Sequence, residues 1–377
     1  LDELKVYRGA LTDAMVLSDY NAAACGITPP APPANFNCVE SGADASTGHL
    51  YTKLVGTAFS FDVAALKADG TVEATYASDV NKPVTVELVD GSGATACASR
   101  TAISPAVSQT LTFAAANVGR KAAAAMTVNK AYANLRCRVT DANQSPSIVG
   151  CSTDNFSVRP LSLQATSSAN ADGAGISGTA TPAVKAGASF SLTATALAGY
   201  DGTPKVDSSK LAAHAGAIQA GSLGGSFGAG DPGTGVATGN FAYSEVGYFN
   251  FAANGIYDDT YTTVDSAGDC TNDFSNSPVG GKYGCLFGNT STTNYFGRFI
   301  PDHFTVVTPV PFAAGCLAGG FSYMDQPFST SLSASIEARN TVNAKTRNYN
   351  GATFGKAVVS VQMENNNSGT PIPGARL

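Results

Sequence analysis

The sequence predicts an all-β protein built from tandem β-sandwich domains. Three observations carry this prediction. Short segments alternate apolar and polar residues with period two, and clusters of Gly, Asn and Asp separate them at short intervals. A third observation is an internal repeat of about 130–140 residues, a length typical of a single domain.

The repeat is carried by two phrases. Residues 56–66 (GTAFSFDVAAL) resemble residues 187–197 (GASFSLTATAL), and each segment is followed by Asp-Gly-Thr, which favours a turn. A third copy is expected at 326–336. The phrase at 154–158 (DNFSV) recurs at 302–306 (DHFTV), and we interpret it as the strand that joins one domain to the next.

Further alternating segments lie between these markers. They predict strands at 84–89, 109–113, 133–140, 239–243 and 247–252. Short strands at this spacing indicate immunoglobulin-like β-sandwiches. Helical signals are weak and limited to 12–20 and the Ala-rich 206–220, while the Gly-rich segment 221–239 is predicted to be a long surface loop.

The markers divide the chain into domains. Residues 51–157 and 158–303 form two sandwich units, and 304–377 form a partial third unit. Residues 20–50 are expected to be a Pro-rich linker closed by a disulfide, and residues 1–19 lie outside the repeat. Because no signal-peptide pattern opens the chain, we expect a processed part of a longer secreted protein, with the rest of the third unit removed or absent.

Composition excludes several classes of protein. Only 13% of the 377 residues are charged and the net charge is −6, so there is no basic face for nucleic acid. The hydrophobic content of 44% is too high for a disordered chain. No run approaches the roughly 18–20 apolar residues that span a bilayer, so no membrane span is expected.

The cysteines indicate an oxidising compartment. Their number is even and none has zinc-site spacing; they are Cys25, Cys38, Cys97, Cys137, Cys151, Cys270, Cys285 and Cys316. Two pairs bracket loops, Cys25 with Cys38 and Cys270 with Cys285. Cys97 can pair with Cys137 or Cys151, and Cys316 is unassigned. The alternative is that the thiols are reduced and buried as small apolar groups.

One catalytic pattern is present by letter only. Residues 224–228 (GGSFG) fit the G-x-S-x-G of a nucleophile elbow, which needs a strand before it and a helix after it. Both flanks are Gly-rich instead, and His49, His214 and His303 have no triad context. We therefore expect no enzyme. A carbohydrate-active enzyme would need paired carboxylates on a concave site, and no such pair is placed.

A structural calcium ion is a weaker possibility. The aspartates of one loop cluster within sixteen residues; they are Asp258, Asp259, Asp265, Asp269 and Asp273. Hard oxygen ligands on a turn-rich loop suit Ca²⁺. The EF-hand spacing is absent, and such loops are usually only solvated. No other cofactor is expected.

Several ordered phrases resemble one bacterial family. Residues 297–304 (GRFIPDHF) match its "GRF-x-PDHF" signature; the residues concerned are Arg298, Phe299, Pro301, Asp302, His303 and Phe304. Residues 151–160, 245–249, 321–328 and 348–351 fit the same pattern. The family is the large secreted protein encoded with mannose-sensitive haemagglutinin type IV pili. Its C-terminal region has no assigned activity. The sister phrase has Asn155 where His303 stands, which favours a positional hydrogen-bonding role for that histidine.

The opening segment resembles another fold. Residues 1–14 (LDELKVYRGALTDA) are similar to the last strand of laminin-G or concanavalin-like jelly rolls. The resemblance implies that residues 1–19 are the terminal strand of an upstream jelly roll. Any glycan site would belong to that domain, which this chain does not contain.

Together these features predict a non-enzymatic, extracellular structural and adhesive module of a bacterial surface appendage, linked to type IV pili. The alternative is a self-assembling filament or sheath subunit that uses strand addition between chains, since few charges repel neighbouring copies. An orphan strand at 4–7, or a half-sandwich after Phe304, would then be completed by a neighbour. Expected partners are other copies of the chain or pilus components.

Overall fold

The computed structural model describes residues 31–168, 184–265, 268–307 and 334–350, together with isolated residues at 10, 12, 354–355 and 357–359. Within these ranges the chain forms β-strands joined by turns and a few short 3-10 turns. The prediction of an all-β protein is confirmed. None of the helical turns in the described ranges has the length and apolar character needed to cross a membrane.

The chain folds into two compact units. Unit 1 comprises the chain up to Tyr51 with Thr57–Val128 and Asn134–Phe156. Unit 2 comprises Thr52–Gly56, Asn129–Ala133 and the chain from Ser157 onward. Two short segments that interrupt the first unit in the sequence therefore belong to the second, which boundaries drawn along the sequence do not anticipate.

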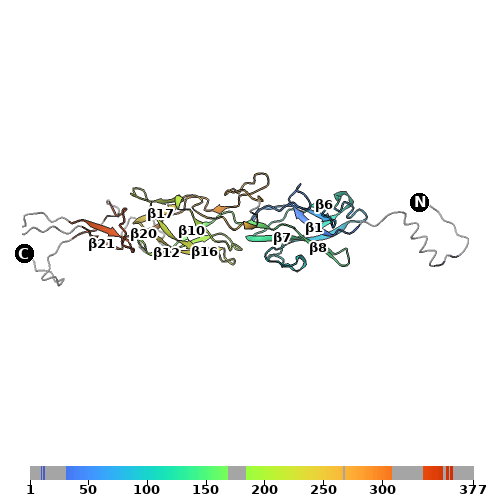
Figure 1. Cartoon of the computed structure of the whole chain (residues 1–377), viewed down its shortest axis with the longest axis horizontal. Helices are drawn as coiled ribbons and strands as arrows, with labels where there is room; N and C mark the ends of the chain where they lie inside the picture. Colours follow the sequence, from blue (N-terminus) through green and yellow to red (C-terminus); the bar gives the residue numbers. More distant parts are fainter. Residues whose placement is uncertain are drawn as a thin grey trace, which may run out of the picture. The chain divides into compact units, whose positions relative to one another are not determined.

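Unit 1 contains two antiparallel sheets. One has the order β1-β3-β6, and the other contains β5, β4 and β7 in that order, with β8 paired to β7 (Figure 1). The strands are β1 Asn35–Val39, β3 Asp62–Leu66, β4 Lys82–Asp90, β5 Ser108–Phe113, β6 Arg120–Ala122, β7 Tyr132–Asp141 and β8 Ile148–Cys151. The predicted alternation of β4 is observed, because Val84, Val86 and Leu88 are buried on one face.

The core of unit 1 is built on aromatic side chains. The Tyr76 ring packs edge-on against Phe36 and Phe113, with centroids 5.6 and 5.2 Å away. The Tyr76 hydroxyl donates to Asp141 Oδ2 at 2.8 Å, which gives this buried polar group a partner. Burial and the neighbouring carboxylate raise the pKa of Tyr76 far above its usual value, so the hydroxyl stays protonated.

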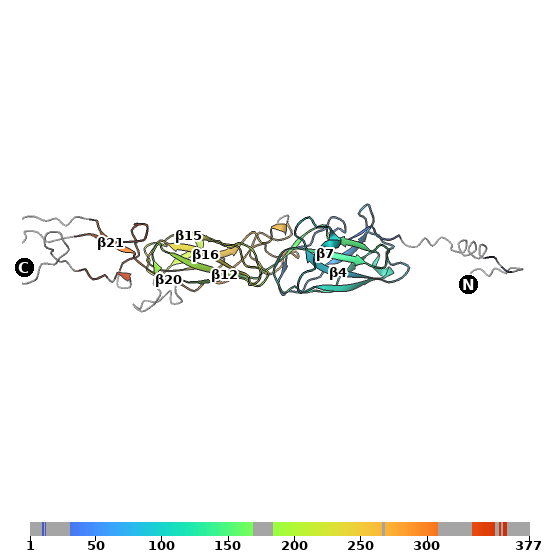
Figure 2. The same cartoon turned by 90° about the horizontal axis from the view of Figure 1, so that it is seen from below.

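Unit 2 contains two four-stranded sheets, ordered β10-β12-β16-β15 and β11-β20-β17-β14, and two smaller sheets, β13-β18-β19 and β21-β22. β2 pairs in parallel with β9. Figure 2 shows β12, β16 and β15 side by side. The bounds are β2 Lys53–Leu54, β9 Phe156–Arg159, β10 Gln164–Ser167, β11 Val184–Lys185, β12 Ser189–Thr195, β13 Lys205–Val206, β14 Leu211–Ala213, β15 Leu223–Phe227, β16 Val236–Tyr243, β17 Gly247–Phe251, β18 Ile256–Asp258, β19 Phe287–Gly288, β20 Phe296–Ile300, β21 His303–Val306 and β22 Ile336–Arg339.

Phenylalanine and tyrosine also build the core of unit 2. Phe299 contacts Phe190, Tyr243 and Phe249, with ring centroids 5.1, 5.0 and 5.9 Å away. These residues come from β20, β12, β16 and β17, so one cluster ties both large sheets together. In a chain without tryptophan, such aromatic contacts supply much of the buried area.

The internal repeat is a structural repeat. Its first phrase forms β3 in unit 1 and β12 in unit 2. A two-residue strand precedes each copy and pairs in parallel, β2 with β9 and β11 with β20. Gly56 and Gly187, which open the two copies, both have left-handed backbone angles (φ 73° and 83°). Glycine adopts this conformation without steric cost, which explains why both copies begin with it.

Two predicted segments differ in the structure. The expected loop at 221–239 contains β15 and part of β16. A Cβ atom on Gly225 or Gly239 would collide with the Phe241 ring and neighbouring backbone, so the glycines let Phe241 cover the ladder closely. Composition alone indicates a loop because the packing that stabilises these glycines comes from another strand. The Ala-rich segment 206–220 contains β14 and a 3-10 turn in place of a helix.

The expected linker at 20–50 is wrong over its described part. Asn35–Val39 is β1, which pairs with β3 over five register positions and carries buried Phe36, Cys38 and Val39. The prolines precede this strand. The jelly-roll strand at 1–19, the helical signal at 12–20, and all but the last residues of the third repeat copy at 326–336 lie outside the described residues.

Candidate functional site

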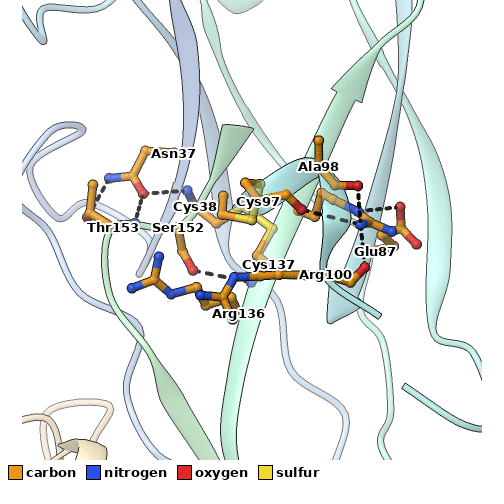
Figure 3. The surroundings of a disulfide bond; sticks show 12 residues. Asn37, Cys38, Glu87, Cys97, Ala98, Arg100, Arg136, Cys137, Ser152 and Thr153 are labelled. Atoms are coloured by element: carbon orange, nitrogen blue, oxygen red, sulfur yellow. Dashed lines mark hydrogen bonds and ion pairs between the residues drawn. A yellow bond between two sulfur atoms is a disulfide. The ribbon is translucent and has the colours of Figure 1, made fainter. Parts of the chain in front are cut away.

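Two disulfides cross-link unit 1, and neither closes a short loop (Figure 3). Cys38 of β1 pairs with Cys137 of β7 across 99 residues, and Cys97 pairs with Cys151 of β8 across 54 residues. The predicted Cys25–Cys38 bridge is therefore wrong. Cys38 lies inside a strand whose neighbour across the core is Cys137, so geometry and not sequence proximity selects the partner. Of the two alternatives for Cys97, the structure selects Cys151.

Buried polar groups surround these disulfides. Asn37 Oδ1 accepts hydrogen bonds from the N–H groups of Cys38 and Thr153, at 2.9 and 3.0 Å. The Arg138 guanidinium donates to Glu87 Oε1 at 2.9 Å and to the Arg100 carbonyl at 2.6 Å. The cross-links thus sit among satisfied hydrogen bonds and hold the strands in one register.

The third disulfide, Cys270–Cys285 in unit 2, is confirmed. Arg159, which is fully buried, holds its loop in place. The guanidinium donates to the carbonyls of Gly284 (2.6 Å) and Ser275 (2.8 Å) and to Asn276 Oδ1 (2.9 Å). Burial lowers the pKa of Arg159 to about 10, which leaves the group charged at neutral pH. Cys25 and Cys316 lie outside the described residues.

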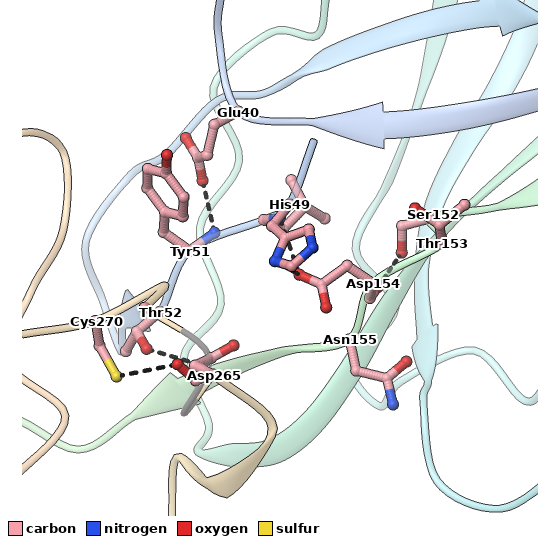
Figure 4. Close-up of polar contacts among 12 residues, drawn as sticks. Glu40, His49, Tyr51, Thr52, Ser152, Thr153, Asp154, Asn155, Asp265 and Cys270 are labelled. Carbon is pink, nitrogen blue, oxygen red and sulfur yellow. Dashed lines mark hydrogen bonds and ion pairs between the residues drawn. The ribbon is translucent and has the colours of Figure 1, made fainter. Parts of the chain in front are cut away.

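Asp265 connects the start of unit 2 to the same loop region. Its Oδ2 accepts from the Thr52 hydroxyl at 2.7 Å and from the Ser157 N–H at 3.0 Å (Figure 4). The Sγ atom of the disulfide-bonded Cys270 lies 3.6 Å from the Asp265 carbonyl oxygen. A fully buried carboxylate with such donors is a structural anchor for the segments 52–56 and 157–159.

The five candidate calcium-binding aspartates are engaged separately. Asp258 Oδ2 accepts from the Tyr200 hydroxyl at 2.5 Å, and Asp259 forms an ion pair with Lys205 at 2.7 Å. Asp265 has the contacts described above. Asp269 is buried beside Cys270, and Asp273 Oδ1 accepts from the Ser275 N–H at 2.9 Å. Backbone N–H groups, hydroxyls and a lysine bind these carboxylates separately. The structure therefore does not bring the five carboxylates together in one site.

A second buried carboxylate joins two of the phrases that resemble the pilus-associated family. Glu245 Oε2 accepts from the Asn348 N–H at 3.0 Å, and Oε1 accepts from the Arg347 N–H at 3.1 Å and from the Gln219 amide. Asn348 in turn accepts from the Ile218 and Gln219 N–H groups, at 2.9 and 3.1 Å. We call Glu245, Asn348 and Gln219 the carboxylate clasp. It fixes the segment 347–348 to two turns, the one that follows β14, at Gln219, and the one that precedes β17, at Glu245.

The remaining signature residues have separate roles. Phe299 belongs to the aromatic core, while Arg298 and Pro301 flank it at the end of β20. Asp302 forms an ion pair with Lys185 at 2.9 Å. His303 contacts Asp302 Oδ2 through Nδ1 at 2.8 Å and Asn343 Oδ1 through Nε2 at 3.2 Å, which fits a positional role. Hydrogen bonds from Lys185 and His303 hold the pKa of Asp302 below its usual value.

Phe304 lines a groove over the ribbon β21-β22. The groove has a volume of about 720 Å³. Apolar and charged side chains both line it; the lining includes Phe304, Ile336, Ala338, Tyr349, Glu337 and Lys345. Phe304 is 47% exposed, whereas its repeat equivalent Phe156 is fully buried. The groove can hold an apolar chain or ligand, and the Glu337–Lys345 ion pair belongs to its lining.

Ser226 of the G-x-S-x-G pattern is not at a nucleophile elbow. It lies in β15, an outer strand of its sheet, and is followed by loop residues and not by a helix. The sequence did not reveal the carboxylate clasp or the Arg159 contacts, because a single Glu or Arg carries no pattern. The only available signal was the presence of Glu245 and Asn348 in two phrases of the same family signature.

Comparisons with known proteins give one family match. Residues 245–376 match the family model DUF6701, third domain, which covers about a third of the chain and begins at Glu245. No curated protein matches the chain. Two solved structures show weak likeness. The Escherichia coli adhesin FdeC has 14% identity and a TM-score of 0.28, with 59% of this chain and 60% of that chain covered. A marsupial T cell receptor has 13% identity and a TM-score of 0.23, with 58% of each chain covered. The matched part spans less than two thirds of either protein.

Proposed function

We propose that this chain is a non-enzymatic structural and adhesive segment of an extracellular bacterial protein that is associated with type IV pili. The observation that carries the proposal is the set of disulfides. Cys38–Cys137 and Cys97–Cys151 join different strands of one unit, and Cys270–Cys285 closes a loop of the other. Such bonds persist in oxidising compartments and are reduced in the cytosol, which supports an extracellular location.

Internal anchoring supports a structural role. Asp265, Glu245 and Arg159 are buried charged groups, and each one joins segments 103 to 213 residues apart through hydrogen bonds. Groups of this kind favour a single arrangement of strands at a cost in desolvation. That is a useful property in a module whose task is to hold its shape outside the cell.

The pilus association rests on the signature phrases and on the DUF6701 match over 245–376. Two of those phrases, at 245–249 and 348–351, meet at the carboxylate clasp, which supports a structural role for them. The expected partners are pilus components, other copies of this chain, and glycans bound by an upstream domain.

The test uses the organism that makes the protein. Protease treatment of intact cells should release fragments of this chain, and deletion of its coding region should reduce attachment to surfaces while growth is unchanged. Complementation with the full-length protein should restore attachment. A chain protected from protease in intact cells, or attachment unaffected by the deletion, would overturn the proposal.

A second candidate function is a subunit that self-assembles by strand addition between chains. The observation that favours it is the outer edge of β15, whose backbone groups are uncovered in the described part of the molecule. Light scattering of the purified chain over a wide concentration range separates the two functions, since a solitary structural module stays monomeric.

A further inference from the structure

Strand β15 (Leu223–Phe227) forms one edge of the sheet β10-β12-β16-β15. Gly228 N–H donates to the Thr238 carbonyl, and Ser244 N–H donates to the Ser222 carbonyl, at 3.0 and 2.9 Å. Hydrogen-bonded positions alternate along an antiparallel pair. The even-numbered residues therefore point their backbone groups toward β16, and Leu223 and Gly225 point theirs outward.

The outward groups are uncovered in the part of the chain that the structure describes. In those ranges β15 pairs only with β16, so the outward N–H and carbonyl groups of Leu223 and Gly225 have no strand partner. The loop after β15 is held to the loop before β13 by the Gly230 N–H and the Gly202 carbonyl (2.7 Å). The free part of the edge is thus 223–226.

This edge lacks the devices that guard other edges of the chain. In unit 1, Lys121 Nζ donates to the Thr112 carbonyl of the outer strand β5 at 2.5 Å, and Gln109 exchanges two hydrogen bonds with Ala124. Charged side chains and covering segments of this kind prevent edge-to-edge pairing. Residues 221–230 contain no charge, no proline and no long polar side chain.

We propose that the outer edge of β15 is a self-association site, at which β15 of a second copy of this chain pairs antiparallel about a two-fold axis at Gly225. In that arrangement Gly225 of one copy exchanges two backbone hydrogen bonds with Gly225 of the other. Gly224 of each copy then lies opposite Ser226 of its partner. The result is a continuous eight-stranded sheet.

A second copy fits this edge better than a charged peptide does. A two-fold axis places identical segments opposite each other, so any charge on β15 would face a like charge. The segment has none. On the solvent face, Gly224 has open space around its Cβ position and Ser226 is exposed, so no side chain obstructs the partner strand. The neighbouring face of β12 and β16 carries small uncharged groups such as Thr193 and Thr238.

The inference rests on the second candidate function, and charge pairs test it at specific positions. The double variant Gly224→Glu/Ser226→Glu places carboxylates opposite each other across the two-fold axis, and should weaken dimerisation at least about tenfold, since like charges directly opposite each other repel. The variant Gly224→Lys/Ser226→Glu places opposite charges there and should dimerise as the natural chain does. Both substitutions lie on open surface, so folding is unaffected.

The experiment is sedimentation velocity on the full oxidised chain over a wide concentration range. Asn240→Glu is the matched control, since Asn240 is exposed on the same face, opposite Ser226 in the register but on the inner strand β16. It should leave dimerisation unchanged. A natural chain that stays monomeric overturns both self-assembly and this site. A natural dimer that the double-glutamate variant leaves intact, or that the Lys/Glu variant also loses, overturns this site while self-assembly by another surface stands.

Discussion

The Glu245 carboxylate accepts a hydrogen bond from the backbone N–H of Asn348 at 3.0 Å across 103 residues of sequence. This contact joins the connection before β17 to the segment that follows β22. It lies within the part of the chain that matches DUF6701, third domain, and the match begins at Glu245. The clasp therefore joins two segments of the matched region that lie far apart in sequence.

The clasp predicts a specific loss of stability. Glu245→Gln keeps the side chain's size but replaces one acceptor oxygen by a donor group that faces N–H donors. We expect unfolding free energy to fall by about 2–3 kcal/mol, because a buried hydrogen bond to a charged group is lost and a donor is left unpaired. Urea denaturation of the oxidised chain measures it.

Glu337→Gln is the control for the clasp, since Glu337 is a surface carboxylate that pairs with Lys345 and Arg339. It should change stability much less. Equal losses in the two variants would mean that the clasp has no special role.

The disulfides predict an order of effects. Removing Cys38–Cys137 with paired Cys→Ala substitutions should cost about 4–5 kcal/mol, and removing Cys270–Cys285 about 3 kcal/mol, since a longer closed loop gains more freedom in the unfolded chain. Thermal unfolding of the two double variants tests this. An inverse order would show that strain or local packing, and not loop entropy, dominates.

The contacts of the Phe241 ring predict how the glycine-rich strand pair β15 and β16 is stabilised. Phe241→Ala should destabilise unit 2 by about 3–5 kcal/mol, because it removes the cover over Gly225 and Gly239 and the contact with Phe227 at 4.9 Å. Amide hydrogen exchange should show the largest loss of protection in β15 and β16. Tyr295→Ala, at a partly exposed ring, should cost less, and uniform loss of protection would contradict this explanation.

The ion pair between Asp302 and Lys185 predicts that the pKa of Asp302 changes when Lys185 is replaced. Since Lys185 and His303 lower the pKa of Asp302, the interaction stabilises the fold above the unfolded carboxyl's pKa and is lost as the pH falls through the lower, folded value. Lys185→Met should raise the Asp302 pKa toward 3.8, the ordinary value. Carbon-detected NMR titration measures it. Lys121→Met, whose ammonium contacts a carbonyl, should leave it unchanged.

Local patterns in the sequence were enough to predict the strands and the repeat. Period-two alternation located β4, β7 and β12, and the repeated phrase located equivalent positions in both units. Gly225 shows where such reasoning fails. Its place in a strand depends on Phe241 from the neighbouring strand, and no local signal carries that information.

Partner choice was predictable only where the partners lie close in sequence. Cys270 and Cys285 are separated by 15 residues, and their pairing follows from the loop that they bracket. Cys38 pairs with Cys137 because β1 and β7 face each other across a core, which depends on the whole unit. The contacts of Arg159, Asp265 and Glu245 are long-range for the same reason.

The disulfide state of the natural protein distinguishes an oxidised, extracellular protein from one held in a reducing compartment. Protein recovered from intact cells is blocked with a thiol reagent, digested without reductant and analysed by mass spectrometry. We expect linked peptides for Cys38–Cys137, Cys97–Cys151 and Cys270–Cys285. Blocked free thiols at these six positions would contradict an oxidised, extracellular β-sandwich protein.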